Sequence, residues 1–496
     1  MTRFRSVSET DIERLAEGLG LTFAAGETSG AVDRIDALAD VYRALEDAPA
    51  GGVTDDPTGG DRFGTAPYRP PDAENRYNQW VTRFELTREG ATGDLDDLDV
   101  ALKDNMCVRG VELTCGSRAL ERFVPGDHAT VADRLLDAGA TVVGKTNMDE
   151  FAFGPTSETS AFGPTANPAD ADHVAGGSSS GSAAAVAAGE VDLALGTDTG
   201  GSVRMPASYC GIVGVKPSFG LVPTYGVAEL SYSMDHVGTL ARDVETAARG
   251  LDAIADTGPE GDRSSFADDL GTDPGTLRIG IEPRFFERHV SDAVERSVRD
   301  TVDELRDAGA EVRPVEVPTL DDSRAAWWGI APVEFAAMFA TRGAGVWRNE
   351  PVEPSLAAAI AGLRGSASRD LGTNVTEMLL LGAHLIRTHG GHHYVRGQHL
   401  RRRLDREFDA ALADVDVLAT PTTPTTALEI DGFERGTTPP VNWDTHPTNL
   451  TGHPSVSVPC GDSDGLPVGL QFIGGHAEDV TVLDAAATTE RVASVA

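Results

Sequence analysis

The chain begins with two stretches in which apolar residues recur at helical spacing. In residues 8–18 polar capping residues precede Ile12, Leu15 and Ala16, and in residues 31–46 the apolar positions again lie three or four residues apart. Residues 47–75 are then rich in Gly, Pro and Asp, a composition typical of loops and linkers. We therefore predict a small helical N-terminal region with its linker over 1–75, followed by a separate region over 76–496.

Beyond residue 97, short apolar runs alternate with helical periodicity. An apolar run over 97–102 is followed by a helical stretch over 129–138 and by a second apolar run that starts at Thr141. The same order returns between residues 277 and 318, and no repeat of fixed period is present. This alternation predicts an α/β fold, in which helices cover a central sheet.

The charge of the chain excludes several classes of function. Its 496 residues include 78 acidic and 41 basic side chains, a formal net charge of −37, which repels nucleic-acid phosphates and anionic lipid. No run approaches the ~20 apolar residues that span a bilayer, and the first residues lack a signal-peptide core. We therefore expect a cytoplasmic protein without direct nucleic-acid or membrane partners. A role linked to tRNA would need a partner protein that supplies basic surface.

Lysine is almost absent from the chain. Lys103, Lys145 and Lys216 are the only lysines, and arginine makes up the other basic residues. The acid excess and the scarcity of lysine together resemble the surface chemistry of proteins from salt-loving organisms, and we take a halophilic source as a hypothesis. A lysine kept in such a chain is expected to do what arginine cannot, such as losing its proton when buried.

The segment 175–223 carries the most information about chemistry. It opens with glycines and serines, continues with an alanine-rich helical stretch over 182–188 and strand-like residues over 191–195, and then reads Gly-Thr-Asp-Thr-Gly-Gly-Ser. A helix that runs out and a strand that returns would bring Ser178 and Ser202 side by side. These two serines are therefore candidate catalytic residues.

A glycine pair directly precedes Ser202. Such a pair lets the backbone turn so that successive N–H groups converge on one point, which is the geometry that an oxyanion needs. The candidate oxyanion-hole residues are Thr199, Gly200, Gly201 and Ser202. The string Gly-Ser-Ser-Ser-Gly over 177–181 also fits the nucleophile elbow of α/β-hydrolases with Ser179 at its centre, but no strand-like run precedes it.

These motifs resemble those of the amidase signature family. The matching elements are Gly-Gly-Ser-Ser at 176–179, Asp-x-Gly-Gly-Ser-Val-Arg-x-Pro at 198–206 and Cys-Gly-x-x-Gly-x-Lys-Pro at 210–217. Further matches, such as Val-Ala-Leu-Lys-Asp-Asn at 100–105, extend the resemblance over roughly residues 76–485. The resemblance implies a single large domain with a mixed central β-sheet covered by helices on both faces.

The resemblance also assigns catalytic roles. In this family the lysine of the Lys-Asp-Asn motif is the base, a serine held after a cis peptide is the bridge, and the serine after Gly-Gly is the nucleophile, which implies Lys103, Ser178 and Ser202. Neutral Lys103 would take a proton from Ser178, which would accept one from Ser202 as Ser202 attacks the amide. Water would then hydrolyse the acyl-enzyme, and this chemistry requires no metal or organic cofactor.

Other candidate sites are weaker. Three histidines near residue 390 lack an accompanying acidic or cysteine ligand motif, so no metal site is expected at His389, His392 and His393. The four cysteines show no metal-binding or disulfide spacing, and no phosphate-binding Gly-x-x-x-x-Gly-Lys motif occurs. The basic run 401–403 is expected to form helix-surface ion pairs with Asp405, Glu407 and Asp409.

Three classes of protein compete for this chain: a stand-alone amidase, the glutaminase component of a tRNA-dependent amidotransferase, and a non-catalytic structural relative. The triad disfavours the third, since such a protein has no need of Lys103. The amidotransferase pattern Val-Lys-Arg-Arg-Ile-x-Leu-Gly offers arginine to the carboxylate of glutamine, whereas residues 375–382 place Glu377 and Met378 there. The acid expected to bind the ammonium group is replaced by Asn442, although Asp444 lies nearby. The sequence therefore favours the stand-alone amidase, with glutamine not its preferred substrate.

The acyl group of the substrate is left open by the sequence. An aromatic-rich stretch lies in a region that lines substrate pockets in relatives, although the same residues could equally be core: Trp327, Trp328, Phe335, Met338 and Phe339. The expected partner is a small amide, hydrolysed to a carboxylate and ammonia, and a homodimer is left open.

Overall fold

The chain divides into two compact units, Met1–Pro57 and Thr58–Ala496. A computed structural model describes residues 5–19, 21–22, 27–47, 60–256, 265–268, 270–287, 289–341, 352–363, 367–432 and 440–493. The described part of the first unit contains the helices α1 (Glu9–Leu19), α2 (Glu27–Asp36) and α3 (Ala39–Asp47). The helix predicted over 8–18 is confirmed as α1, whereas the helix predicted over 31–46 is divided between α2 and α3, because the chain turns at residues 37 and 38.

The predicted linker contains a strand. β1 (Asp61–Tyr68) lies within 47–75 and pairs antiparallel with β2 (Trp80–Arg88). The composition misses this strand because β1 is the edge strand of the sheet and its residues are almost all exposed, so no apolar run marks it. Residues 48–59 of the predicted linker lie outside the described residues.

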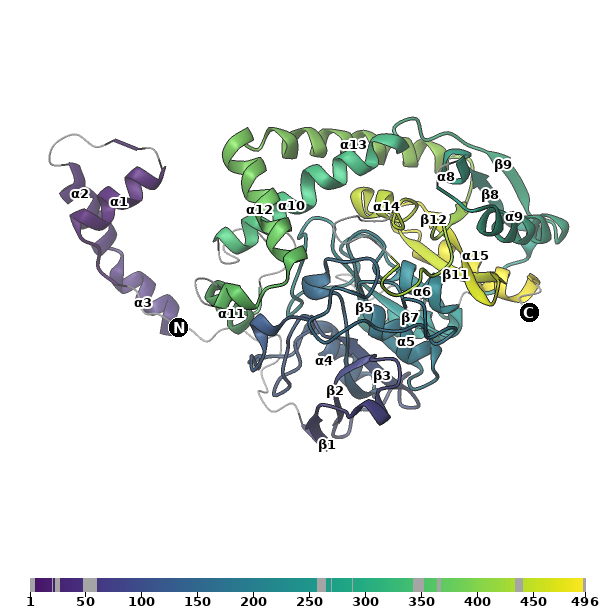
Figure 1. Cartoon of the computed structure of the whole chain (residues 1–496), viewed down its shortest axis with the longest axis horizontal. Helices are drawn as coiled ribbons and strands as arrows, with labels where there is room; N and C mark the ends of the chain where they lie inside the picture. The colour runs from purple at the N-terminus through teal and green to yellow at the C-terminus, as the bar shows by residue number, and fades with distance from the viewer. Residues whose placement is uncertain are drawn as a thin grey trace. The chain divides into compact units, whose positions relative to one another are not determined.

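Within the described residues, twelve strands form one sheet in the order β1-β2-β4-β3-β5-β7-β6-β11-β12-β10-β8-β9 (Figure 1). β3 pairs in parallel with β4 and β5, β8 pairs in parallel with β9 and β10, and the other pairs are antiparallel. The remaining strands are β3 (Asp99–Lys103), β4 (Thr141–Thr146), β5 (Leu193–Asp198), β6 (Val213–Lys216), β7 (His236–Ala241), β8 (Arg278–Ile281), β9 (Glu311–Pro314), β10 (Val417–Pro421), β11 (Ser455–Ser463) and β12 (Leu466–Gly474). The predicted mixed sheet is confirmed.

Helices alternate with these strands along the chain, as the sequence predicts. The described helices of the second unit are α4 (Thr130–Asp137), α5 (Ser180–Ala187), α6 (Arg204–Cys210), α7 (Val244–Ile254), α8 (Arg284–Glu287), α9 (Asp292–Asp307), α10 (Ser323–Thr341), α11 (Pro354–Gly362), α12 (Thr373–His389), α13 (His392–Leu412), α14 (His446–Thr451) and α15 (Asp479–Val492). None of the helices in the described ranges combines the length and apolar character needed to cross a membrane.

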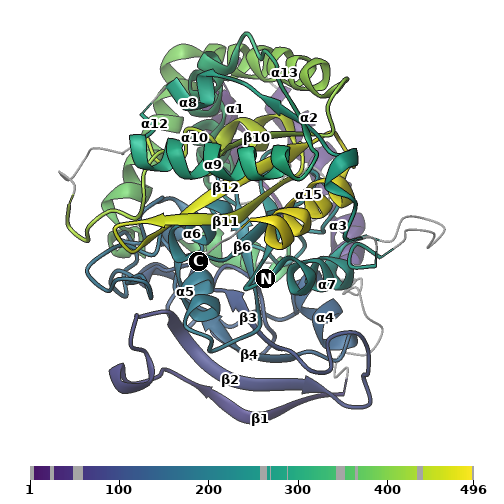
Figure 2. The same ribbon diagram turned by 90° about the vertical axis from the view of Figure 1, so that its right-hand side faces the viewer.

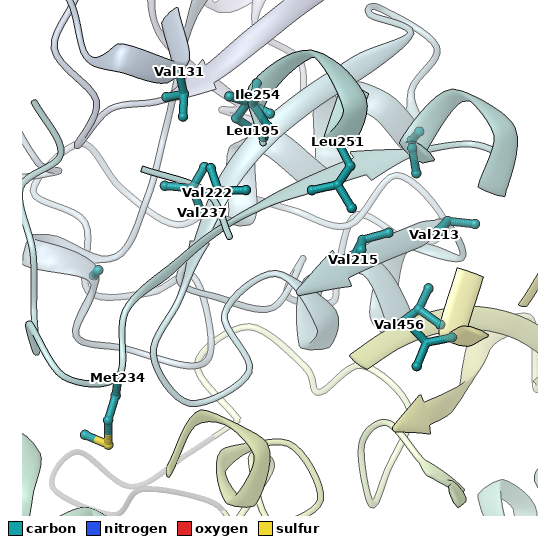
Figure 3. Close-up of a cluster of buried hydrophobic side chains, with 14 of the residues drawn as sticks. Val131, Leu195, Val213, Val215, Val222, Met234, Val237, Leu251, Ile254 and Val456 are labelled. Atoms are coloured by element: carbon teal, nitrogen blue, oxygen red, sulfur yellow. The ribbon is translucent and has the colours of Figure 1, made fainter. Parts of the chain in front are cut away.

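The centre of the sheet is apolar on both faces. In β3, Val100 and Leu102 point to one face and Ala101 to the other, and β5 repeats this alternation over 193–195. One face is covered by α4 and α7 in the large core cluster, which Figure 3 shows around Leu195 and Leu251. The opposite face is covered by α5 and α6, and Figure 2 shows the sheet between these layers. Strands buried on both sides produce the continuous apolar runs seen in the sequence.

α5 consists almost entirely of small residues and is buried along its length from Ser180 to Val186. Small side chains allow its backbone to approach the sheet closely: a Cβ atom on Gly181 would lie 2.3 Å from the carbonyl oxygen of Gln79. β5 follows α5 and returns the chain through the middle of the sheet. Ser178 lies in the loop before α5 and Ser202 in the loop after β5. Because the helix runs out and the strand runs back, both loops lie at the same end of the central strands.

We expect Leu195→Ala to destabilise the second unit by about 2–5 kcal/mol, because Leu195 has no exposed surface and its truncation leaves a cavity in the core. Leu380→Ala is the matched control, since Leu380 on α12 is 64% exposed and its truncation should change stability by about 0.5 kcal/mol or less. Urea unfolding followed by circular dichroism measures both variants. Equal destabilisation by the two substitutions would contradict this account of the core.

Candidate active site

Lys103 is the last residue of β3 and is completely buried. Its Nζ lies 2.7 Å from Ser178 Oγ and 2.8 Å from Thr197 Oγ1, and it also donates to the carbonyl oxygen of Thr197 at 3.3 Å. Because β3 and β5 are parallel neighbours, Thr197 near the end of β5 comes directly beside Lys103. Thr197 belongs to no recognised motif position, and its place one residue before Asp198 in the signature segment is the only signal for it in the sequence.

Burial lowers the pKa of Lys103 to about 7, and the nearby carboxylates of Asp149, Asp198 and Asp235 only partly oppose this effect. A lysine with an ordinary pKa would be charged at neutral pH and unable to accept a proton. Lys103 is instead poised between its charged and neutral forms near pH 7. The structure therefore gives Lys103 both the contact and the protonation equilibrium that a base requires.

Ser178 precedes α5 and is completely buried, and the peptide bond between Gly177 and Ser178 is cis, as the family resemblance implies. The carbonyl oxygen of Ser178 accepts the N–H of Asp149 at 3.3 Å. A Cβ atom on Gly177 would lie 1.9 Å from Asp149 Oδ2, so only glycine fits at this position. Ser178 is thus held between the main chain of Asp149 and the ammonium group of Lys103.

Ser202 lies in the turn between β5 and α6. Its carbonyl oxygen accepts the N–H of Ser179 at 3.1 Å, which places it next to Ser178 in space. In the described part of the chain, however, the hydroxyl groups of Ser178 and Ser202 share no hydrogen bond, and such contacts often tighten only when substrate binds. Ser202 is 7% exposed whereas Ser178 is fully buried, so Ser202 is the serine that reaches the surface of the site.

The residues predicted to form the oxyanion hole make up this turn. Gly201 has φ +123°, and a Cβ atom there would lie 2.1 Å from Thr445 Oγ1, so the turn requires glycine. The N–H of Gly201 donates to Asp198 Oδ1 at 2.8 Å and is already satisfied. No acceptor among the described residues meets the N–H groups of Thr199, Gly200 and Ser202. These three amides are the ones that remain for an oxyanion.

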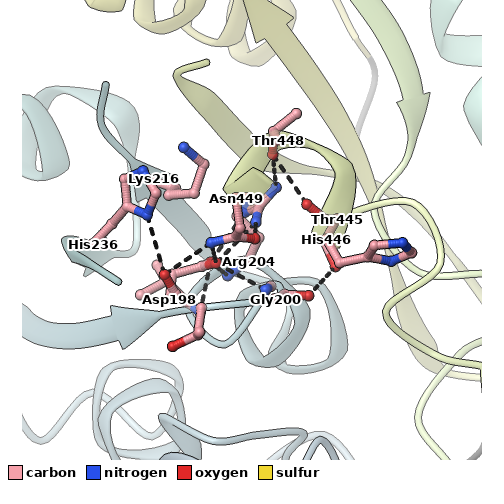
Figure 4. A network of polar contacts seen from close by, with 12 residues as sticks. Asp198, Gly200, Arg204, Lys216, His236, Thr445, His446, Thr448 and Asn449 are labelled. Carbon is pink, nitrogen blue, oxygen red and sulfur yellow. Dashed lines mark hydrogen bonds and ion pairs between the residues drawn. The ribbon is translucent and has the colours of Figure 1, made fainter. Parts of the chain in front are cut away.

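A buried ion pair organises the turn (Figure 4). Asp198 and Arg204 are both fully buried and make a two-point contact, with Nε donating to Oδ2 at 3.0 Å and Nη2 to Oδ1 at 2.9 Å. Burial alone would raise the pKa of Asp198, but the guanidinium group of Arg204 outweighs it and holds that pKa below its usual range. The same carboxylate also accepts the main-chain N–H groups of residues 201, 203 and 204.

The remaining donors of Arg204 reach the C-terminal part of the chain. They contact Thr448 and Asn449 on α14 and Gln471 on β12 at 2.7–2.8 Å. Asn449 in turn donates to Asp198 Oδ1 at 2.8 Å. The network in Figure 4 therefore joins the turn that carries Ser202 to two elements that lie far along the sequence.

Comparison with known proteins decides the family. The family model described as Amidase matches residues 68–483. The chain belongs to the amidase signature family. It is 40% identical over 439 residues to the A subunit of glutamyl-tRNA(Gln) amidotransferase from Synechococcus sp. (strain CC9311), covering 83% of this chain and 90% of the relative. It is also 40% identical over 419 residues to the protein of that name from Methanosarcina mazei, with 82% and 87% covered.

Solved structures of both kinds of family member resemble this amidase. The same amidotransferase component from Thermotoga maritima matches with a TM-score of 0.67 and 34% identity over 80% of this chain and 83% of that one. The native peptide amidase from Stenotrophomonas maltophilia matches with the same TM-score and identity over 81% and 84%. The chain is therefore a hydrolase of the amidase signature family that acts on carbon–nitrogen bonds, as predicted.

Of the predicted pocket residues, Trp327 contacts the turn that carries Ser202. Its Nε1 donates to the carbonyl oxygen of Thr199 at 3.0 Å. Phe335, by contrast, packs in the core with ring centroids 6.4 Å from Phe151 and 5.0 Å from Phe339. Asn442 also borders the turn, because a Cβ atom on Gly200 would lie 3.4 Å from Asn442 Nδ2.

Two buried carboxylates near the site were missed by sequence reasoning. Asp235 accepts hydrogen bonds from the Thr199 hydroxyl and from the main chain of residues 230 and 231, while burial raises its pKa to about 7. Glu334 accepts from Ser231, Ser233 and Tyr394, and burial raises its pKa as well. Neither lies in a recognised motif, so only the three-dimensional contacts reveal them.

The residues on which the sequence-based preference for a stand-alone amidase rests lie in different environments. Met378 is buried, Glu377 is exposed, and Asp444 is fully buried with neither carboxylate oxygen bonded to any described residue. Burial raises the pKa of Asp444 well above its usual range.

The predicted histidine group at 389–393 is exposed where α12 meets α13, with its rings in edge contact.

The pH dependence of this amidase should follow Lys103. Because the predicted base must be neutral to act and the pKa of Lys103 is about 7, kcat/KM should rise as the pH increases through about 7 and level off above it. A pH series on the purified chain measures this, with the unfolding midpoint recorded at each pH to exclude denaturation. Activity that falls across the same interval would contradict a neutral lysine base.

Lys103→Arg should lower kcat by about 10²–10⁴-fold, close to the effect of Lys103→Ala, because arginine stays protonated and cannot act as a base. The measurement is steady-state ammonia release by the two variants under identical conditions. An Arg variant with nearly full activity would show that Lys103 acts only as a fixed positive charge.

Proposed function

We propose that this amidase hydrolyses a primary carboxamide to a carboxylate and ammonia through an acyl-enzyme on Ser202. The observation that carries the proposal is the 2.7 Å contact between Lys103 Nζ and Ser178 Oγ, at a lysine whose pKa is about 7. Neutral Lys103 takes the Ser178 proton, Ser178 takes the proton of Ser202, and Ser202 Oγ bonds to the amide carbon. Three groups thus act in one relay.

The negative charge that develops on the carbonyl oxygen is placed against the amides of Thr199, Gly200 and Ser202. Donors fixed in advance stabilise such a charge without reorganising during the reaction. The relayed proton then passes to the leaving nitrogen, which departs as ammonia when the C–N bond breaks. Water attacks the ester on Ser202 by the same relay in reverse, releases the carboxylate and restores the serine.

Similarity supports glutamine as the first amide to consider. The curated relatives described above are amidotransferase components, and they match this chain over most of their length, which supports the glutaminase alternative better than the stand-alone amidase that the sequence favours. A glutaminase of that kind would act together with a partner that supplies the basic surface absent from a chain of net charge −37.

One observation favours the stand-alone alternative. By comparison with the amidotransferase pattern, Glu377 and Met378 replace the arginines for glutamine's carboxylate and Asn442 replaces the acid for its ammonium group, and Asn442 borders Gly200 in the site. A buried charge without a partner is costly, so an uncharged carboxamide would fit these side chains better than glutamine. The peptide amidase from Stenotrophomonas maltophilia, a structural relative, agrees with this alternative.

Ser202→Ala should abolish ammonia release, because the hydroxyl supplies the nucleophile rather than packing. Ser180→Ala is the matched control from the same segment: the Ser180 hydroxyl makes one long contact, 3.4 Å to the carbonyl oxygen of Asn147, and its loss should change turnover little. Both variants are assayed after their unfolding midpoints are shown to match the parent. Turnover by a folded Ser202→Ala protein would refute the proposal.

Asn442→Asp should raise the preference for glutamine. We expect the ratio of kcat/KM for glutamine over an uncharged carboxamide to increase roughly 10–100-fold, the value of a hydrogen bond to a charged group. Glutaramate, which lacks only the ammonium group of glutamine, is the control substrate, and its ratio should not rise. If glutamine and glutaramate respond alike, Asn442 does not face the substrate's amino group and gives no reason to disfavour glutamine.

A further inference from the structure

Four ligand-type side chains from three segments meet away from the catalytic triad. Asp405 and Asp409 lie one turn apart on α13, His453 follows α14, and His476 lies between β12 and α15. α13 and α14 are in contact, as Figure 1 also shows. The sequence predicts arginine partners for these acids on the helix surface, and Arg403 does pair with Glu407 at 2.9 Å. Asp405 and Asp409 instead contact the two histidines.

His453 has no exposed surface and is held in a single orientation. Its ring Nδ1 lies 2.8 Å from Thr451 Oγ1, and its carbonyl oxygen accepts Lys216 Nζ at 2.6 Å. The Thr451 hydroxyl also lies 3.3 Å from the carbonyl oxygen of Pro447, so it can donate its hydrogen there and accept from His453. In that tautomer the ring carries its proton on Nδ1 and a lone pair on Nε2.

The lone pair of His453 Nε2 is buried and unsatisfied. It makes no hydrogen bond with any described residue, although Asp409 Oδ1 lies 3.4 Å away. In the tautomer protonated on Nδ1, the nitrogen and the carboxylate oxygen both present lone pairs, so their contact is favourable only with a cation between them. Histidine ligands of metals show this same arrangement, with the other ring N–H donated to an oxygen.

The distances between the candidate ligand atoms are short enough for one shared ion. Single ligand atoms of Asp405, His453 and His476 all lie within 4.8 Å of one another. His476 Nε2 is 2.9 Å from Asp405 Oδ1 and 3.9 Å from Asp409 Oδ1. In a tetrahedral site with bonds of about 2.0–2.1 Å, neighbouring ligand atoms are about 3.3 Å apart. The His476 ring now stacks on the His453 ring with centroids 3.9 Å apart, so the partly exposed side chains of Asp405, Asp409 and His476 would rotate around the fixed His453 ring to complete the site.

We propose that Asp405, Asp409, His453 and His476 bind one divalent transition-metal ion of the zinc type. Imidazole nitrogen favours zinc over magnesium or calcium, which prefer oxygen ligands throughout. The side chains of Asp405, Asp409 and His476 are 36–54% exposed, which gives the ion a route of entry. The ion would connect α13 to the loop before β11 and to the loop after β12. The neighbouring helix α14 contributes Thr448 and Asn449 to the contacts of Arg204, so the proposed metal site lies beside the network that holds the turn of Ser202.

The experiment measures zinc binding by the full-length chain after chelator treatment. Titration against a competing fluorescent chelator, in molar KCl and excess Mg²⁺ to occupy scattered carboxylates, should give one tight Zn²⁺ per chain. Zinc should also raise the unfolding midpoint, because it binds only the folded state. His476→Ala should weaken binding by more than about a hundredfold and remove this stabilisation. Asp405→Asn, at a second partly exposed position, should weaken binding as well.

His399→Ala is the matched control, since His399 is exposed on α13 outside the cluster and should leave zinc affinity unchanged. Co²⁺ in the parent should give the intense visible absorption of a tetrahedral site, and His476→Ala should lose it. The exposed histidines near residue 390 are a rival location. If the double variant His389→Ala/His393→Ala lost the tight zinc while His476→Ala kept it, or if the parent bound no tight zinc, the proposal would be overturned.

Discussion

The ion pair between Asp198 and Arg204 is the interaction on which the catalytic turn depends. Two charges without exposed surface are stable only when their remaining donors and acceptors are also satisfied, and here main-chain amides, Asn449, Thr448 and Gln471 satisfy them. Removing one partner would leave the other charge buried and unpaired, at a cost of about 3–5 kcal/mol. The geometry of Ser202, the proposed nucleophile, and of the amides beside it is thus maintained by residues that have no part in the proposed relay.

The scarcity of lysine becomes meaningful once burial is known, because all three lysines lie at positions with no exposed surface. Lys103 contacts Ser178, Lys145 pairs with Asp104 at 2.9 Å, and Lys216 donates to main-chain carbonyl oxygens. A compact ammonium group fits such narrow polar cavities, whereas the planar guanidinium group of arginine is wider and keeps its charge. The surface carries arginine and acid instead, and a halophilic source stays a hypothesis about that surface.

The predictable part of this structure is local. The strands at 99–103 and 141–146 and the helices α1 and α4 follow from apolar spacing within a few residues, and the family resemblance brings Lys103 and Ser178 together across 75 positions. The catalytic roles stay predictions. What could not be predicted depends on contacts between distant segments: Arg204 reaches Gln471, 267 residues away, and the edge strand β1 is defined only by its pairing with β2.

The substrate is likewise harder to infer than the reaction. Identity of 40% over more than 400 residues shows a shared fold and family, and one fold can serve many different substrates. The charge of a substrate, in contrast, can be matched by one or two side chains, and under the proposal above the relevant positions are those of Met378 and Asn442. Similarity is therefore strong evidence for the reaction and weak evidence for the acyl group. The free energy of a single charge-assisted hydrogen bond, about 1.5–3 kcal/mol, is enough to decide between glutamine and an uncharged amide.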